Sequence, residues 1–150
     1  MKIYEVPKDS DQSLRTRIAD LLMGQMESLG KDDAYERLIH AIHLTLHPNS
    51  TAHIFVAEKE GQLLGAAFFN IGVSITKGGH YLWLNDLYVH KEHRNQGIAK
   101  KILLSLIYWA ENKEIKGIEL ETGMNNEATK ALYNSLGFYD IISKRYGFRF

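Results

Sequence analysis

The chain contains no cysteine, which excludes disulfide bonds, thiolate zinc sites and cysteine nucleophiles together. It also lacks any apolar run near the roughly 18 residues that a membrane-spanning helix needs. Its N-terminal segment is mixed and charged, whereas a secretory signal is basic and then apolar. We therefore expect a cytoplasmic protein with no membrane partner.

An excess of charge of one sign is missing as well, since 18 Lys and Arg residues balance 18 Asp and Glu residues. Such a chain has no overall field that would attract nucleic acid, so we expect no nucleic-acid partner. Its 150 residues, of which 45% are hydrophobic and 24% charged, are typical of one globular domain. The sequence predicts a single domain over 1–150 that acts on a small molecule or a peptide.

Hydrophobic periodicity predicts one short strand and two helices in the N-terminal part of the chain. The strand spans 2–7, where a proline ends the ladder. Apolar residues from Leu14 to Leu29 recur at helical spacing, and a second amphipathic helix follows Asp33 and ends near Pro48.

The middle of the chain predicts three antiparallel strands over 53–58, 62–73 and 80–90, with a hairpin turn at 59–61. Strict alternation divides the third strand into two faces. One face carries Tyr81, Trp83, Asn85, Leu87 and Val89, and the other carries Leu82, Leu84, Asp86 and Tyr88.

The remaining pattern predicts helices from Gly97 to near Lys113 and over 125–136, and strands over 117–121, 138–142 and 144–150. The fold class is therefore α+β. We expect a mixed, mostly antiparallel sheet of about six to seven strands, flanked by about four helices.

The loop before the long helix has the features of an anion site. The unpaired amides and the dipole at a helix N-terminus both favour phosphate, and Gly97 lets a ligand approach the backbone closely. Arg94 and Lys100 or Lys101 add positive charge beside it. A pyrophosphate is the ligand that this pattern favours, and the absence of Gly-x-Gly-x-x-Gly argues against a dinucleotide fold.

Two sequence blocks resemble the GNAT acyltransferases. Residues 86–102, DLYVHKEHRNQGIAKKI, are similar to the acetyl-CoA signature of that family, which is a strand, then Gln/Arg-x-x-Gly-x-Gly/Ala, then a helix. Residues 126–138, NEATKALYNSLGF, resemble the family's helix with an asparagine, a Leu-Tyr pair and a Gly-Phe exit. Ala99 stands where many members carry glycine, a departure that the family tolerates, and Thr129 stands where alanine is usual, a departure that bears only on helix packing.

The resemblance implies acetyl-CoA as cosubstrate and assigns its binding residues. The loop from Arg94 to Ala99 would hold the pyrophosphate, and the backbone of residues 87–89 would pair with the pantetheine arm like an added strand. The expected cofactor-binding residues are Leu87, Tyr88, Val89, Arg94, Asn95, Gln96, Gly97, Ile98, Ala99, Lys100, Asn126 and Tyr133.

The expected catalytic residues are Tyr133, which the resemblance implies, and Asp86, which is an acidic residue that could serve as the base. Tyrosine is protonated at neutral pH, so Tyr133 can donate a proton to the departing thiolate. Asp86 or Glu121 would remove the proton of the amine, directly or through water. Asp86 has an equal alternative role as a buried carboxylate bonded to backbone amides, and Glu121 has one as a strand-end charge.

No metal is expected. His40, His43 and His47 share one helical face, but no carboxylate completes a ligand set at a clear spacing, and a solvated face or a rim of the acceptor pocket accounts for them.

The acceptor is left open among polyamine-like amines, amino acids, aminoglycosides and peptides. Residues 81–89, YLWLNDLYV, most resemble the diamine and polyamine acetyltransferases and related histone-type members of the family. Those members usually have Glu-Asp where this chain has Asn85-Asp86, and the loss of one acid weakens the polyamine assignment. The alternative function is a sensor that binds CoA or acyl-CoA without turnover. The aromatic C-terminal run, with Tyr146, Phe148 and Phe150, favours core or homodimer packing over nucleic-acid stacking.

Overall fold

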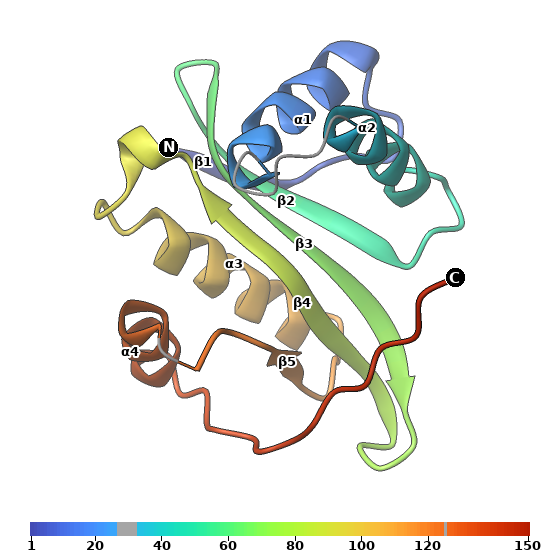
Figure 1. The fold of residues 1–150 in the computed structure, drawn as a ribbon, viewed down its shortest axis with the longest axis vertical. Coiled ribbons are helices and arrows are strands. Elements are labelled where there is room, and N and C mark those ends of the chain that lie inside the picture. Colours follow the sequence, from blue (N-terminus) through green and yellow to red (C-terminus); the bar gives the residue numbers. More distant parts are fainter. Residues whose placement is uncertain (27–32, 125) are drawn as a thin grey trace.

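The computed structural model describes residues 1–26, 33–124 and 126–150 (Figure 1). In chain order the elements are β1 (Lys2–Glu5), α1 (Gln12–Met26), α2 (Ala34–Thr45), β2 (Ala52–Lys59), β3 (Gln62–Ser74), β4 (Gly79–Val89), the short 3-10 helix η2 (Lys91–His93), α3 (Ile98–Asn112), β5 (Ile118–Leu120) and α4 (Glu127–Ser135). Most boundaries lie within a few residues of the predicted ones. Leu29 and Asn125, which were predicted to be helical, lie outside the described residues.

The sheet has the strand order β1-β2-β3-β4-β5, which is also the order of the strands in the sequence. Each of the first four strands pairs with its neighbour antiparallel, and β5 pairs with β4 parallel. The crossover through α3 makes this last pair parallel, because α3 carries the chain back along the sheet. The predicted α+β class and the mixed, mostly antiparallel sheet are confirmed.

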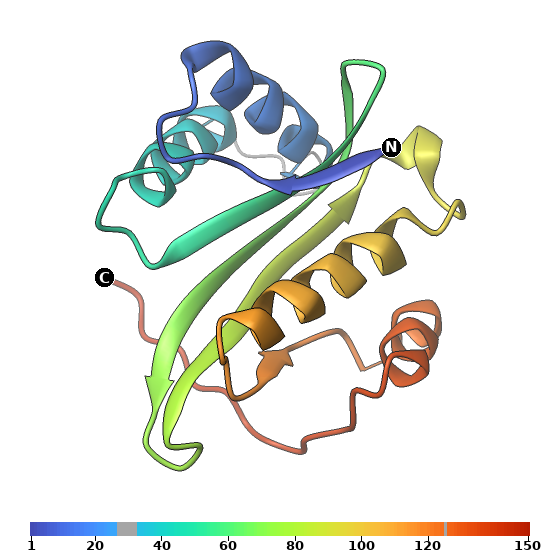
Figure 2. The ribbon, with the colours of Figure 1, turned by 180° about the vertical axis from the view of Figure 1, so that it is seen from behind.

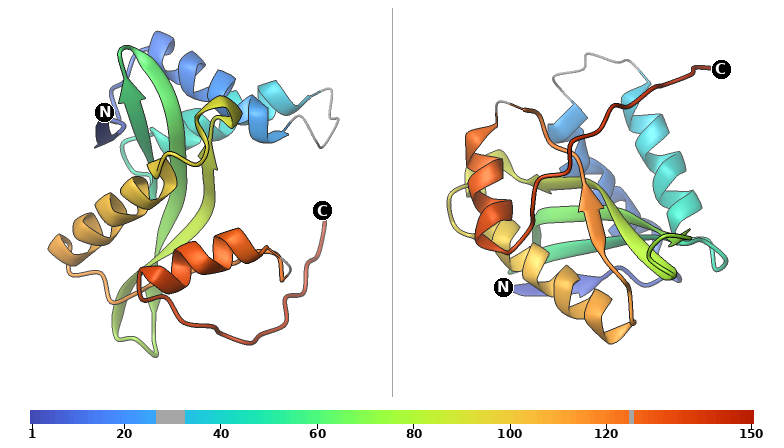
Figure 3. Two further views of the ribbon diagram at one scale, coloured as in Figure 1. Left: turned by 90° about the vertical axis from the view of Figure 1, so that its left-hand side faces the viewer. Right: turned by 90° about the horizontal axis from the view of Figure 1, so that it is seen from below.

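Helices cover both faces of the sheet. Figures 1 and 2 show α1 and α2 on one face and α3 on the other, and Figure 3 shows this layering from the side and from below. Ile18 of α1 and Val56 of β2 are buried on the first face, and Leu82 of β4 and Ile102 of α3 are buried on the second. Burial of each such side chain stabilises the fold by roughly 1.5–3 kcal/mol.

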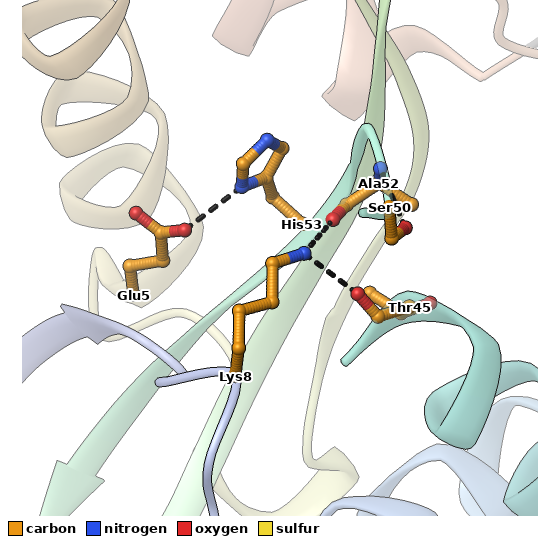
Figure 4. Close-up of polar contacts among 6 residues, drawn as sticks. All are labelled: Glu5, Lys8, Thr45, Ser50, Ala52 and His53. Atoms are coloured by element: carbon orange, nitrogen blue, oxygen red, sulfur yellow. Dashed lines mark hydrogen bonds and ion pairs between the residues drawn. The ribbon is translucent and has the colours of Figure 1, made fainter. Parts of the chain in front are cut away.

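A polar cluster fixes the N-terminal strand and the end of α2 against β2 (Figure 4). The Nζ atom of Lys8 donates hydrogen bonds to the carbonyl oxygens of Thr45 at 2.7 Å and Ala52 at 2.8 Å. Burial lowers the pKa of Lys8. Because Thr45 is the last residue of α2, the ammonium group also lies where the helix dipole favours a positive charge.

His53 extends this cluster toward α3. Its Nδ1 lies 2.8 Å from Oε2 of Glu5, and its ring stacks on Phe69 with the ring centroids 5.2 Å apart. The indole of Trp109 on α3 lies at the same centroid distance from the imidazole. The hydrogen bond from His53 holds the pKa of Glu5 below its ordinary value.

The predicted strands over 138–142 and 144–150 are wrong. Residues 138–150 form no helix or strand, so the sheet has five strands among the described residues rather than six to seven. A strand needs a ladder partner and a core to cover one of its faces, and β5 offers an edge of three residues. The large side chains of the segment, such as Ile142 and Phe148, are instead exposed.

Candidate active site

A β-bulge at Asn85 shapes the middle of β4. The ladder pairs Phe69 with Leu84 and Phe68 with Asp86, so Asn85 is an extra residue in β4. The side-chain amide of Asn70 on β3 donates a 2.8 Å hydrogen bond to Oδ1 of Asn85. Such a bulge bends its strand and increases the local twist.

The bulge corrects the predicted faces of β4. Leu82 and Leu84 lie in the core cluster that packs on α3, and so do Leu87 and Val89, although strict alternation placed these two pairs on opposite sides. Tyr88 instead packs in the cluster beneath α1 and α2. The extra residue shifts the alternation of side chains by one position, and this shift is why the faces after Asn85 differ from the predicted ones.

Beyond the bulge, β4 separates from β5. The parallel ladder joins Leu82–Leu84 to Ile118–Leu120, and no described strand pairs with residues 87–89 on that edge. The backbone of these residues is therefore available to an extended ligand, which could add to β4 as a strand does. The Nε atom of Arg94 donates to the Val89 carbonyl at 3.2 Å, so one of these backbone groups is already paired.

The loop that follows β4 leads into the N-terminus of α3 with its amides open. Asn95 and Gly97 both have left-handed backbone conformations, with φ values of 64° and 76°. Gly97 is the N-cap of α3, and no side chain in the described part of the structure caps that end of the helix. A Cβ atom built on Gly97 would meet no atom of the described residues within 4 Å, so these residues leave the space before the helix open. Alternating backbone conformations of this kind make concave anion sites, and the dipole of α3 adds to the effect.

Cationic side chains border this loop. The guanidinium of Arg94 lies 5.7 Å from the centroid of the Tyr88 ring, which holds it against the end of β4. Lys100 is exposed on the first turn of α3, and Gln96 is exposed in the loop. Of the predicted pyrophosphate residues, Arg94 to Gly97 and Lys100 are exposed, whereas the side chain of Ile98 is buried in the core, so that Ile98 can offer a phosphate only its backbone amide.

Tyr133 projects from α4 into the core on the α3 side. Its ring is 9% exposed and packs edge-on against Phe138, with the centroids 5.3 Å apart. Leu87 and Val89 of β4 pack against the core cluster to which Tyr133 belongs. Burial raises the pKa of Tyr133 above its ordinary value, which keeps the hydroxyl protonated at neutral pH.

Asn126 is the N-cap of α4, because its Oδ1 accepts a hydrogen bond of 3.2 Å from the backbone amide of Thr129. Sequence comparison assigned this side chain to the cofactor arm. The structure gives its oxygen a local role in starting the helix that carries Tyr133.

Asp86 lies half-buried on the face of β4 that α1 covers. The amide of Gln25, in the last turn of α1, donates to Oδ1 of Asp86 at 3.1 Å. Among the described residues no backbone amide donates to this carboxylate, so the structural alternative of a carboxylate held by backbone amides finds no support.

Glu121 is held by an ion pair. A guanidinium nitrogen of Arg145 donates to its Oε2, and both side chains are largely exposed. This pairing favours the strand-end role of Glu121 over that of a base.

The three histidines of the α2 region, His40, His43 and His47, are exposed. His43 lies 3.4 Å from Arg15, and His47 accepts from the Asn49 amide. Within the described ranges, no group of three or more potential ligands is placed to hold a metal ion. In the same part of the chain, no helix has the length and apolarity to cross a bilayer.

Comparison with known proteins identifies the family. The profile of the acetyltransferase (GNAT) family matches residues 15–138. The chain belongs to the GNAT family. N-acetyltransferase 8 of Rattus norvegicus is 32% identical over 84 residues, which are 56% of this chain and 38% of the rat protein. The chain thus spans about two fifths of the length of that curated relative.

Solved GNAT-fold structures share the whole architecture. A probable acetyltransferase superposes with a TM-score of 0.84 at 23% identity and covers 100% of this chain and 98% of its own. An aminoglycoside N-acetyltransferase in complex with CoA superposes with a TM-score of 0.77 at 19% identity, covering 99% of this chain and 93% of its own. At these identities the likeness establishes the fold.

Sequence reasoning missed two features of this GNAT site. The bulge at Asn85 had a signal, because the leucines of this strand change from even positions, 82 and 84, to an odd one, 87. Gln25 had none, since its contact with Asp86 spans 61 residues and depends on how α1 docks.

Proposed function

We propose that this protein is an acetyl-CoA-dependent N-acetyltransferase that transfers the acetyl group to a primary amine. The observation that carries the proposal is the opening of β4 at its bulge, directly before the uncapped N-terminus of α3, in a chain of the GNAT family. This arrangement supplies a backbone edge for an extended arm and an anion site at the end of that edge.

The cosubstrate is bound by the residues that the sequence predicts. The amides of Gly97 to Lys100 and the side chain of Arg94 hold the pyrophosphate, and the backbone of 87–89 pairs with the pantetheine arm. Bound acetyl-CoA supplies an activated thioester carbonyl. A backbone amide near Val89 stabilises the negative charge that develops on its oxygen.

The chain's own groups then carry the protons of the reaction. Asp86 accepts a proton from the ammonium of the acceptor, directly or through water, and frees the nitrogen lone pair for attack on the carbonyl carbon. As the C–N bond forms and the C–S bond breaks, Tyr133 donates its hydroxyl proton to the sulfur. The acylated nitrogen then loses its second proton to the Tyr133 oxygen, directly or through water, and Asp86 releases its proton to solvent. The products are the acetylated amine, CoA and one proton.

The acceptor class is a small-molecule amine, with polyamine-like amines, amino acids and aminoglycosides as candidates, or a peptide amine. Solved proteins of the same fold include an aminoglycoside N-acetyltransferase and a ribosomal-protein-alanine N-acetyltransferase from Brucella melitensis, which represent the small-molecule and peptide options.

The test is a screen of amines with acetyl-CoA that measures release of the free CoA thiol. The panel contains 2-phenylethylamine, spermidine, L-phenylalanine, kanamycin and an alanine tripeptide. We expect amine-dependent release for at least one class. Binding of acetyl-CoA without release for any amine would refute the proposal and indicate the sensor function.

A further inference from the structure

The last turn of α1 contacts β4 at two neighbouring points. A Cβ atom on Gly24 would lie 2.2 Å from the Tyr88 hydroxyl, so the helix approaches the strand as closely as a glycine permits. The next residue, Gln25, donates from Nε2 to Oδ1 of Asp86 at 3.1 Å. Asp86 and Tyr88 are two residues apart on β4 and therefore face the same side, toward α1. The two contacts together set the position of the end of this helix.

This donor is neutral, and the contact therefore has a particular electrostatic effect. An amide fixes a carboxylate by a hydrogen bond but leaves its negative charge uncompensated, whereas a lysine or arginine in the same place would neutralise it. Among the described residues, Asp86 has no ion-pair partner. The carboxylate is half-buried, so its field is less screened than that of a surface acid.

The Asn85 bulge fixes the other side of the carboxylate. Asn85 is tied to Asn70 of β3, and Asp86 follows directly in the chain. Asp86 is thus anchored through its backbone by the ladder to β3 and through its side chain by α1.

We propose that Gln25 is a positioning residue that orients Asp86 as the binding site for the ammonium group of the acceptor. This inference rests on the proposed function and deepens it, because it identifies the acceptor as an amine that binds in its protonated, cationic form. A neutral amide at position 25 is what keeps the site attractive to a cation.

Three variants separate orientation from charge. Gln25→Lys places a cation beside Asp86 and Gln25→Leu removes the donor without adding charge. Gln12→Lys makes the same charge change at the exposed start of α1. Gln12 bonds only weakly to Thr16, at 3.4 Å, so this control leaves the site untouched.

The readout compares two amines at neutral pH, 2-phenylethylamine, which is cationic, and 2,2,2-trifluoroethylamine, which is neutral. We expect Gln25→Lys to raise KM for 2-phenylethylamine about tenfold or more, with little change in KM for trifluoroethylamine or acetyl-CoA. Gln25→Leu should lower kcat more than it raises KM, because orientation is lost and charge is kept. Gln12→Lys should behave as the wild type does.

If Gln25 had only a structural role, its substitution would raise KM equally for both amines and for acetyl-CoA. That result, or unchanged constants in both Gln25 variants, would overturn the inference. Thermal melting and the Kd of CoA show that each variant is folded.

Calorimetric binding of 2-phenylethylammonium to the CoA-saturated protein separates this inference from the proposed function. If no amine is acetylated, the proposed function fails. Loss of ammonium binding in Gln25→Lys would still support the cation site, and unchanged binding would refute it.

Discussion

Replacement of Gly97 by alanine tests the phosphate site, and Gly61 provides a matched control. Both glycines have left-handed backbones, with φ values of 76° and 79°, and a Cβ atom on either would meet no atom within 4 Å. Gly61 lies in the turn between β2 and β3, and Gly97 begins α3. The two substitutions therefore introduce the same strain without a steric clash in the protein.

The cost of each substitution follows from the backbone conformation. An L-residue in the left-handed region costs roughly 1–2 kcal/mol. For a domain of this size, 1 kcal/mol lowers Tm by about 2–4 °C. We therefore expect Gly97→Ala and Gly61→Ala to melt a similar few degrees below the wild type.

Only Gly97→Ala should weaken the binding of CoA. At about 100 times its Kd, a ligand stabilises the native state by about 2.7 kcal/mol, or roughly 5–11 °C here. If the new methyl group weakens CoA binding about tenfold, this shift is halved at the same ligand concentration. Differential scanning fluorimetry with and without CoA measures both effects. Equal CoA-induced shifts in the two variants would refute the phosphate site at α3.

Three further predictions address catalysis, stability and assembly. Tyr133→Phe should lower kcat by a factor of about 10² to 10⁴ with the Kd of CoA kept, and a wild-type rate with chemistry limiting would reduce Tyr133 to a packing residue. The hydrogen bond to His53 lowers the pKa of Glu5 in the folded protein. The stability that this bond contributes is therefore present above pH 4.5, the ordinary pKa of glutamate, and is lost as the pH falls through the lowered pKa. The Tm of the wild type should therefore fall more steeply in that acidic range than the Tm of Glu5→Gln, and parallel curves would disprove the linkage. Light scattering should show a homodimer that becomes a monomer when residues 144–150 are deleted, and a monomeric full-length chain at about tens of micromolar would contradict the dimer.

The hairpin between β2 and β3 shows what local sequence determines. Lys59 pairs with Gln62, and the two residues between them, Glu60 and Gly61, both have positive φ, as a two-residue hairpin turn requires. The turn residues and the two apolar runs that predict this hairpin are adjacent in the sequence, so its predicted bounds were correct to within about a residue. The Gly97 loop was recognisable for the same reason.

Features that depend on distant contacts escaped prediction. Apolar residues alternate along the C-terminal run as they do in a strand. Such a pattern indicates which side chains a strand would bury, but it does not indicate whether a neighbouring strand is available to pair with it. The partner of Glu121, Arg145, lies 24 residues away along that same run. The sequence leaves two roles open for Asp86, because its hydrogen-bond partner, Gln25, lies 61 residues away in the chain.

The bulge at Asn85 also means that part of this site is encoded by the number of residues in β4. Loss of Asn85 would leave each later side chain on its present face, since regular alternation from Leu84 would again place Asp86 toward α1 and Leu87 toward α3. It would remove the bend instead, and β5 could then pair with β4 beyond Leu84. Exchange of the Asn85 side chain would not have this effect. A library of substitutions at position 85 would therefore leave the edge of β4 at residues 87–89 open. Deletion of the single codon for Asn85 would close that edge.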